Sequence, residues 1–425
     1  MRGVRTFCNV YFGEVRKAAA FEDCDFGPLT KLKFLRITFD CLPKHLAHTA
    51  GRQPSQTPTM ASLTTSSSSS SSSTQQQWEL SSPPSDGITS LKFSKLHPSS
   101  DSLLCSSWDG TVRLYRAKAT TCLWAHTETF AEGDGTTPAA VLSSCFGSSE
   151  QTVYAGGLNK AVSALAVSPT GVSSTTLGLH DQEVKEVAWN AATGTVVSAG
   201  WDNKFCSWDP RAKSKSHLVS TCDLPAKAFT MDVSGRNVIV GCAQRKVVIF
   251  DVRKLNKPVT VLSSSLKHQT RVLRCMPNSS GYALGTVEGR IALEYIDVEE
   301  HETSAYSFKC HRDKKKIVGQ EIVYPVNAIA FHPIHGTFAT GGCDGHVYTW
   351  DGNAKKRLTH YPQYPTSIAT LDFSADGSML AVSSSYTWET GELKDKPKDQ
   401  LFVRSVEEKD VRPRKSKSRK RKKVK

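Results

Sequence analysis

Four residues between positions 180 and 209 are of types that could do chemistry together. His180 precedes one β-rich segment, Ser198 ends the next, Asp202 lies in a turn and Trp208 follows in a third. A Ser, a His and an Asp can act as nucleophile, base and orienting acid of a hydrolase. That mechanism also needs an oxyanion hole and a strained G-x-S-x-G turn, and this stretch has neither motif. We therefore expect a structural hydrogen-bond network that stiffens the local sheet.

The segment "GGCDGHVYTWD" at 341–351 repeats part of this pattern. Thr340, Asp344 and Trp350 are expected to form a second copy, with the glycines allowing the turn. The sequence has no G-x-x-x-x-G-K-[ST] loop, no dinucleotide fingerprint and no H-E-x-x-H motif. His332 and His335 flank a proline and lack a nearby third ligand. We expect no enzyme activity, no cofactor and no metal site.

The positive charge of the chain is concentrated at one end. Of the net +14, +10 belongs to residues 411–425, "VRPRKSKSRKRKKVK", which leaves +4 for the rest. We interpret residues 407–425 as a disordered basic tail. Its cations are expected to direct the protein to the nucleus: Arg414, Lys415, Lys417, Arg419, Lys420, Arg421, Lys422 and Lys423. Attraction to nucleic acid and a merely solubilising role are the alternatives.

The other end of the chain is of low complexity. Residues 1–76 end in "SLTTSSSSSSSSTQQQ", which has too few apolar residues to form a core, so we expect disorder there. Met60 begins "MASLTTSSS", which is typical of a translation start, and residues 1–59 are interpreted as an untranslated upstream extension. A transit peptide is the alternative, which the acids Glu14, Glu22, Asp23 and Asp25 disfavour.

The cysteines and the hydropathy of the chain indicate the kind of cellular compartment in which the protein folds. The twelve cysteines are scattered, without a C-x-x-C pair, which favours a reducing environment. Cys206, Cys275 and Cys343 are then expected to be small buried hydrophobes. No stretch approaches the 18 or so apolar residues of a membrane-spanning helix, and we expect no membrane partner.

The middle of the chain is repetitive. Short β-branched runs recur as "SSWDGTVRLY" at 106, "GGLNKAVSAL" at 156, "AGWDNKFCSWD" at 199, "GCAQRKVVIFD" at 241, "GTVEGRIALEY" at 285 and "GGCDGHVYTWD" at 341. A divergent seventh unit begins with "TSIATLDFSADGSMLAVSSSYT". The spacing of roughly 42 to 56 residues is typical of four-stranded propeller blades. We predict an all-β, seven-bladed WD-repeat β-propeller over residues 77–406, closed by "QWELSSP" at 77–83 as outermost strand of the last blade.

Several strings are more specific than a generic WD repeat. "DGITSLKFS", "SLKHQTRVLRCMPN", "GYALGTVEGRIALEY", "FKCHRDKKK", "YPVNAIAFHPIHGTFATGGCDG" and "YPTSIATLDFSADGSMLAVSSSYT" resemble the mitotic spindle-checkpoint WD-repeat proteins of the Bub family. The messenger-RNA export propellers share the "EGR", "FKCHR" and "VNAIAFHP" pieces. "ALEY" at 292–295 and "YPTSIA" at 364–369 favour the checkpoint family.

The resemblance implies a propeller whose top face binds an extended motif from a Bub-family checkpoint kinase or kinase-like protein. The matched contact positions are Trp108, Trp201, Arg271, Glu288 and Arg290. It also implies recognition of phosphothreonine repeats on a kinetochore scaffold, for which we expect Arg271, Arg290 and Lys309 to gather on one face. The family more often has Arg at the position of Lys309, and Lys lacks its bidentate fork. The alternative is a solvated charged rim, with the tryptophans capping blade edges.

The function implied by this resemblance is that of a non-enzymatic mitotic checkpoint adaptor at unattached kinetochores. It would lie in the nucleus, at the kinetochore in mitosis and in the cytoplasm, with the inhibitor complex of the anaphase-promoting complex as a further partner. An mRNA-export factor that binds a nucleoporin motif and RNA is the alternative. A substrate receptor of a ubiquitin ligase is a third, because propellers host many functions.

Overall fold

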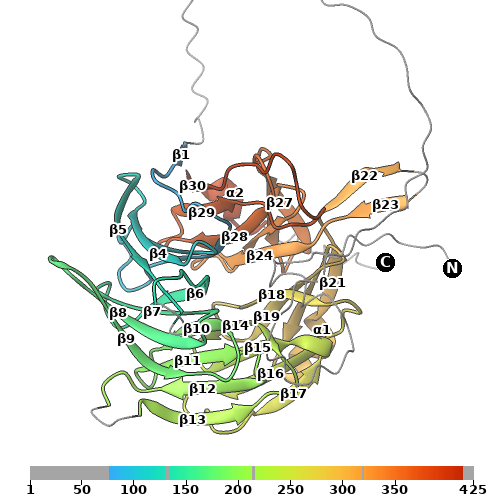
Figure 1. The fold of residues 1–425 in the computed structure, drawn as a ribbon. Coiled ribbons are helices and arrows are strands. Elements are labelled where there is room, and N and C mark those ends of the chain that lie inside the picture. The colour runs from blue at the N-terminus through green and yellow to red at the C-terminus, as the bar shows by residue number, and fades with distance from the viewer. Residues whose placement is uncertain (1–75, 131–134, 213–215, 318–319, 415–425) are drawn as a thin grey trace, which may run out of the picture. The chain divides into compact units, whose positions relative to one another are not determined.

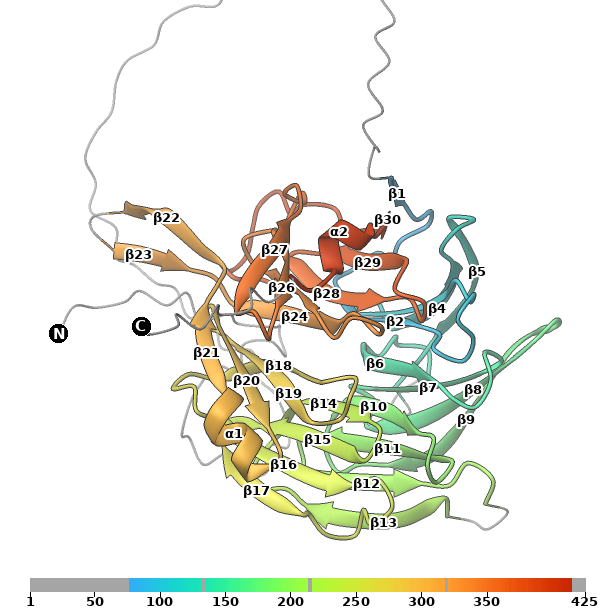
Figure 2. The same ribbon diagram turned by 180° about the vertical axis from the view of Figure 1, so that it is seen from behind.

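The computed structural model describes residues 76–130, 135–212, 216–317 and 320–414. Their dominant feature is seven four-stranded antiparallel sheets, or blades, arranged in a ring (Figure 1 and, from behind, Figure 2). The predicted seven-bladed propeller is confirmed. Within each of blades 1 to 6 the four strands follow one another in the chain, from the innermost to the outermost.

The first four blades have the following strands. Blade 1 has β2 (Ile88–Phe93), β3 (Ser102–Ser107), β4 (Thr111–Arg116) and β5 (Thr121–Thr127); blade 2 has β6 (Val141–Phe146), β7 (Thr152–Gly157), β8 (Ala161–Ser168) and β9 (Gly171–Leu179). Blade 3 has β10 (Val184–Asn190), β11 (Thr195–Gly200), β12 (Lys204–Trp208) and β13 (Leu218–Asp223); blade 4 has β14 (Ala228–Ser234), β15 (Asn237–Cys242), β16 (Lys246–Asp251) and β17 (Thr260–Ser263), with the 3₁₀ turn η2 (Ala243–Arg245).

The remaining blades carry the insertions. Blade 5 has β18 (Thr270–Cys275), β19 (Gly281–Thr286), β20 (Arg290–Tyr295) and β21 (Tyr306–Lys309), with helix α1 (Val298–Ser304); blade 6 has β24 (Val326–Phe331), β25 (Phe338–Gly342), β26 (Val347–Asp351) and β27 (Lys356–His360). Blade 7 has β28 (Ile368–Phe373), β29 (Met379–Ser384) and β30 (Gln400–Ser405). A separate hairpin, β22 (Arg312–Ile317) and β23 (Gln320–Val323), lies between blades 5 and 6 in the chain, and helix α2 (Glu408–Val411) follows blade 7.

The hydrophobic core lies between neighbouring blades. Phe205 of blade 3 stacks on Phe250 of blade 4 with ring centroids 4.4 Å apart, and both side chains are fully buried. Burying such an aromatic ring contributes about 1.5–3 kcal/mol. Cys206, Cys275 and Cys343 are at most 7% exposed, so their predicted role as small buried hydrophobes is confirmed. Each blade is thus stabilised by its two neighbours, which explains why the units recur.

The ring is closed by the N-terminal strand. β1 (Gln77–Glu79) pairs antiparallel with β30, as outermost strand of blade 7, and Leu80 directly after it is 1% exposed. The predicted closure is confirmed, but the strand is shorter than residues 77–83. Trp78, the middle residue of β1, donates from Nε1 to Ala117 O of blade 1 at 2.6 Å.

The C-terminal segment packs back on blade 6. Residues 408–414, assigned from the sequence to a disordered tail, continue as α2 and a short extended run, with Asp410 and Val411 both 2% exposed. Thr349 and Thr337 of blade 6 donate to the carbonyl oxygens of Asp410 and Val411, each at 2.7 Å. The sequence pattern missed this docking because only one apolar residue carries it. Residues 1–75 and 415–425 lie outside the described ranges.

Every blade has a β-bulge at the same place. The register between the innermost strand and its partner shifts after the first residue of the inner strand, so one extra residue is accommodated. A bulge changes the direction of the extra side chain and strengthens the local twist. The seven extra residues are Thr89, Leu142, Lys185, Phe229, Arg271, Asn327 and Ala369.

Candidate functional site

The four polar side chains of blade 3 form one continuous chain of hydrogen bonds. Trp208 Nε1 donates to Ser198 Oγ at 2.7 Å, Ser198 Oγ lies 2.7 Å from His180 Nε2, and His180 Nδ1 lies 2.9 Å from Asp202 Oδ2. The side chain of His180 is 0% exposed and that of Asp202 is 3% exposed. A substrate therefore cannot reach the serine, and the arrangement links strands β11 and β12 to the segment before β10 and to the turn between β11 and β12.

The charge state of this network follows from its contacts. Burial lowers the pKa of His180, but its contacts with Asp202 and Cys206 together outweigh burial and raise that pKa to about 9. Burial would raise the pKa of Asp202, but the contact with His180 lowers it. The two side chains therefore form a buried ion pair at neutral pH.

Blade 6 contains a second such network, with a member that the sequence reasoning missed. Trp350 Nε1 donates to Thr340 Oγ1 at 2.9 Å, Thr340 Oγ1 lies 3.0 Å from His311 Nε2, and His311 Nδ1 lies 2.8 Å from Asp344 Oδ1. His311 is the histidine of "FKCHR", 33 residues before its aspartate. The separation of His180 from Asp202 is 22 residues, and the longer spacing at blade 6 reflects the inserted hairpin β22–β23.

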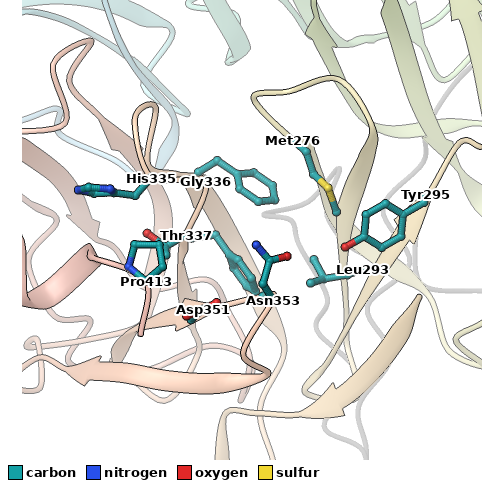
Figure 3. Close-up of a pocket in the computed structure, with 12 residues that line it drawn as sticks. Met276, Leu293, Tyr295, His335, Gly336, Thr337, Asp351, Asn353 and Pro413 are labelled. Atoms are coloured by element: carbon teal, nitrogen blue, oxygen red, sulfur yellow. The ribbon is translucent and has the colours of Figure 1, made fainter. Parts of the chain in front are cut away.

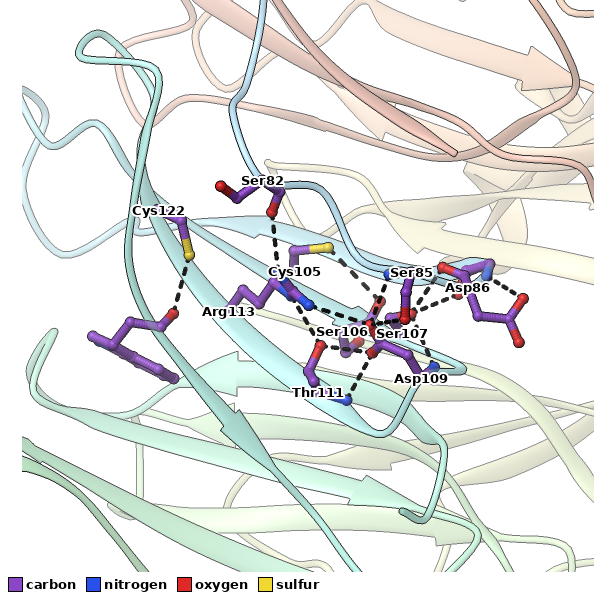
Figure 4. Close-up of polar contacts among 12 residues, drawn as sticks. Ser82, Ser85, Asp86, Cys105, Ser106, Ser107, Asp109, Thr111, Arg113 and Cys122 are labelled. Atoms are coloured by element: carbon purple, nitrogen blue, oxygen red, sulfur yellow. Dashed lines mark hydrogen bonds and ion pairs between the residues drawn. The ribbon is translucent and has the colours of Figure 1, made fainter. Parts of the chain in front are cut away.

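Blade 1 replaces this network by a different one (Figure 4). Asp109 accepts from Ser85 N and Thr111 N, each at 2.9 Å, and Arg113 Nη2 lies 3.3 Å from the Asp109 carboxylate. Arg113 also donates to Ser82 O at 3.1 Å. Asp109 and Arg113 thereby bind the segment between β1 and β2 to the turn that carries Trp108.

The seven connections after the second strand of each blade, counted from the innermost strand (β3, β7, β11, β15, β19, β25 and β29), lie at one end of the ring, here called the upper face. In each blade the residue after that strand donates its N–H to the carbonyl just before the inner strand, at 2.8–3.1 Å. The seven donors are Trp108, Leu158, Trp201, Ala243, Val287, Cys343 and Ser385. The two predicted tryptophans therefore share this face, on blades 1 and 3. Both side chains are partly buried among their neighbours.

The extra residues of the seven bulges lie at the same end of the inner strands. Arg271 is one of them, and its Nη2 and Nε donate to Asn327 Oδ1 of the neighbouring bulge at 3.0 and 3.3 Å. Asn327 Nδ2 donates in turn to Ile368 O of blade 7 at 3.0 Å. Asn327 thus joins blades 5, 6 and 7 and fixes the guanidinium of Arg271. Asn327 could not be identified from the sequence, because the position of a bulge is set by pairing between strands.

The other predicted cations lie at the outer side of blade 5. Arg290 and Lys309 are directly opposite each other on β20 and β21. Lys309 is exposed, and Arg290 Nε lies 3.8 Å from Glu288 Oε1. Glu288 also lies 3.8 Å from Arg312 Nη2 and 3.5 Å from His268 Nε2. The structure therefore pairs Arg290 with Lys309 but directs Arg271 toward blade 6, and Glu288 partly offsets the local positive charge.

The volumes of two cavities in the described part of the chain can be compared with those of small-molecule binding sites. One holds about 40 Å³ between blades 5 and 6, at the end opposite the upper face; Met276, Leu293, Tyr295 and Pro413 line it (Figure 3). This is far below the roughly 300–1,000 Å³ of small-molecule sites. The other, of about 280 Å³, opens on the upper face between blades 6 and 7.

The described residues contain no cluster of three or more His, Cys, Asp or Glu side chains arranged to hold a metal ion. None of the described helices is both long and apolar enough to cross a membrane. Of the predicted nuclear-targeting residues, only Arg414 lies within the described ranges, where its N–H donates to Asp351 Oδ2 at 2.9 Å. Lys415, Lys417, Arg419, Lys420, Arg421, Lys422 and Lys423 lie outside them.

Comparison with known proteins agrees with this architecture. The WD-domain, G-beta-repeat family matches residues 74–116, 171–209 and 303–351. The chain is 45% identical over 339 residues to mitotic checkpoint protein BUB3.1 of Arabidopsis thaliana, covering 79% of this chain and 94% of that protein. It is 40% identical over 340 residues to mitotic checkpoint protein bub3 of Dictyostelium discoideum, covering 79% and 97%. The mRNA export factor GLE2 of Chaetomium thermophilum is 34% identical over 316 residues, covering 74% and 85%.

Proposed function

The chain belongs to the Bub3 family of mitotic checkpoint WD-repeat proteins, and we propose that it is a non-enzymatic adaptor that recruits checkpoint kinases to unattached kinetochores. One peptide, a kinase docking motif, would lie across the upper face. A second, a phosphothreonine repeat of the kinetochore scaffold, would bind at blade 5. Holding both on one rigid ring raises their effective concentration toward each other.

The observation that carries the proposal is the distribution of side chains on the upper face. Two tryptophans on blades 1 and 3 and the cations of blade 5 all lie at the end of the ring where the turns meet. An extended peptide can contact all of them, which a compact ligand cannot. Arg290 and the exposed Lys309 supply two adjacent cations for a phosphate that carries close to two negative charges.

The test is a titration of the purified full chain with a threonine-phosphorylated kinetochore-scaffold peptide and its unphosphorylated twin. We expect binding to depend on the phosphate and to weaken about tenfold or more in Arg290→Glu, because charge-assisted hydrogen bonds are replaced by repulsion. Lys254→Glu, an exposed residue at the opposite end of blade 4, is the matched control. Equal affinity of wild type and a folded Arg290→Glu variant would refute the assignment.

An mRNA-export role is the second candidate. It is favoured by the match to GLE2 and by the match to the poly(A)+ RNA export protein of Schizosaccharomyces pombe, 32% identical over 351 residues. The ten cations of residues 411–425 would then contact RNA phosphates. Binding to single-stranded RNA that falls steeply with salt, together with location at the nuclear envelope, would favour this role. Location in the nucleus and at mitotic kinetochores would favour the adaptor.

A further inference from the structure

The cavity between blades 6 and 7 has walls of unusual composition. They come from three connections on the upper face: the β25–β26 turn with Asp344, the β27–β28 connection with Tyr364, and the β29–β30 insertion with Tyr386, Glu389 and Leu393. Its lining residues include two carboxylates but no Lys, Arg or His. At about 280 Å³ it has room for one long side chain of a bound peptide rather than for a cofactor.

Glu389 carries a negative charge that its contacts do not balance. Its carboxylate accepts from the hydroxyl of Ser367, from Thr387 N at 3.2 Å and from Thr387 Oγ1 at 3.0 Å. All three donors are neutral, and no cation forms an ion pair with Glu389 among the described residues. Partly buried charges in proteins are normally paired. The hydrogen bonds hold the carboxylate in place while leaving its charge for a ligand.

Asp344 adds a second carboxylate to the same cavity. Burial would raise the pKa of Asp344, but its contacts with His311 and His346 together lower that pKa, so the group stays ionised at neutral pH. Its Oδ1 lies 2.8 Å from His311 Nδ1 and accepts from His346 N at 3.2 Å. The aromatic rings of Tyr364 and Tyr386 complete a lining suited to the aliphatic stem and charged head of a basic side chain.

A short relay of hydrogen bonds joins this cavity to Arg271. Thr387 donates to Glu389 and accepts from Asn327 Nδ2 at 3.3 Å, while Asn327 Oδ1 accepts from Arg271. The two charged regions of the upper face are therefore adjacent and opposite in sign. Cations lie on blade 5 and carboxylates lie between blades 6 and 7. The charge of the upper face therefore changes from positive to negative between these two regions.

We propose that the cavity binds the side chain of a lysine or arginine in the docking peptide, whose acidic or phosphorylated part lies over blade 5. The identity of that peptide rests on the proposed function, but the preference of the cavity for a cation does not. Opposite charges at two adjacent sites fix the direction in which a peptide can cross the face. The cavity is thus a specificity-determining site for one basic residue.

The test uses small probes, so that it does not depend on the checkpoint partner. Saturation-transfer NMR on the full chain would compare N-acetyl-arginine amide with N-acetyl-citrulline amide, which has the same shape without the charge. Leu393→Arg places a cation at the cavity wall, where residue 393 is 37% exposed, and Leu218→Arg at a 43% exposed site on blade 3 is the matched control. Glu389→Gln removes the unbalanced charge with little change in volume.

We expect transfer to the arginine probe, little to citrulline, about tenfold weaker arginine binding in Leu393→Arg and Glu389→Gln, and no change in Leu218→Arg. Equal binding of both probes would mean that the cavity does not select charge and would overturn the proposal. Arginine binding that survives both cavity variants, or the absence of transfer to either probe, would overturn it as well. A negative outcome here leaves the phosphopeptide titration unaffected, so the two failures can be told apart.

Discussion

The same residue types that suggest a hydrolase in the sequence serve to hold two blades rigid. His180 lies between Ser198 and Asp202 at distances that a catalytic triad would also show, 2.7 and 2.9 Å. The difference is access, since all three side chains are buried, and the serine accepts from a tryptophan of the same blade. Types and spacing alone could not decide between the two roles, because burial depends on how the neighbouring blades pack.

The His180–Asp202 pair should give the propeller a pH-dependent stability. Asp202→Asn should destabilise the fold by about 2 kcal/mol at pH 6, because a buried charged hydrogen bond is lost. The folded pKa of His180, about 9, exceeds its ordinary value of 6.5, so its contribution is complete below pH 6.5 and lost as pH rises through 9. The lowered pKa of Asp202 means that its contribution is lost in acid, as pH falls below the ordinary 3.8.

Thermal unfolding of wild type and Asp202→Asn at pH 6, 8 and 10 measures this contribution. The difference between their melting temperatures should be largest at pH 6 and should shrink toward pH 10. Asp181→Asn, at a side chain that is 74% exposed and paired with Lys204, is the control and should change little. A difference that stays constant over this range would exclude an ionised histidine.

At the scale of single elements, the closing strand β1 and the residue after it contribute more to the stability of the propeller than the three-residue length of the strand suggests. Leu80 packs with Leu401 and Val403 of blade 7 and with Leu91 of blade 1, so it joins the two ends of the ring. Leu80→Ala should cost about 3 kcal/mol, and removal of residues 76–80 should expose the edge of β30 and promote association. Leu123→Ala, at a 50% exposed position on β5, is the control. Chemical denaturation and size-exclusion chromatography would measure both effects, and equal stability of the two alanine variants would contradict this role.

The elements that sequence reasoning found are those marked by local signals. Gly and Asp in the turns and β-branched residues in the strands identify the seven blades, and the spacing of the repeats identifies the closing strand at 77–83. The bulges escape detection because the extra residue, such as Arg271 or Asn327, differs in chemistry from blade to blade. The His311 partner of Asp344 was missed because an inserted hairpin separates the two residues.

At the scale of the whole molecule, the strand order explains why turns from different blades share one face. Each blade begins at its innermost strand, so every turn after the second strand must come to the same end of the ring. This places Trp108, Trp201, Glu288 and Arg290 together although they span over 180 residues. The sequence could not show that Arg271 is directed to Asn327 while Arg290 is opposite Lys309, because both contacts depend on side-chain packing between strands.

The separation of charge between ring and tail leads to a prediction about location. Eight of the ten cations of residues 411–425 lie after residue 414, so a chain ending at residue 414 should keep its fold but lose nuclear accumulation. The α2 contacts with Thr337 and Thr349 are retained in that chain, so loss of folding would not explain a change in location.

Fluorescent fusions of the full chain, of residues 1–414 and of the Ser416→Asp/Ser418→Asp variant would be imaged in interphase cells. We expect nuclear signal for the first, loss for the second and an intermediate level for the third, since two negative charges weaken the basic run. Unchanged nuclear signal in the shortened chain would refute a targeting role for residues 415–425, and the tail would then be a candidate for contact with nucleic acid.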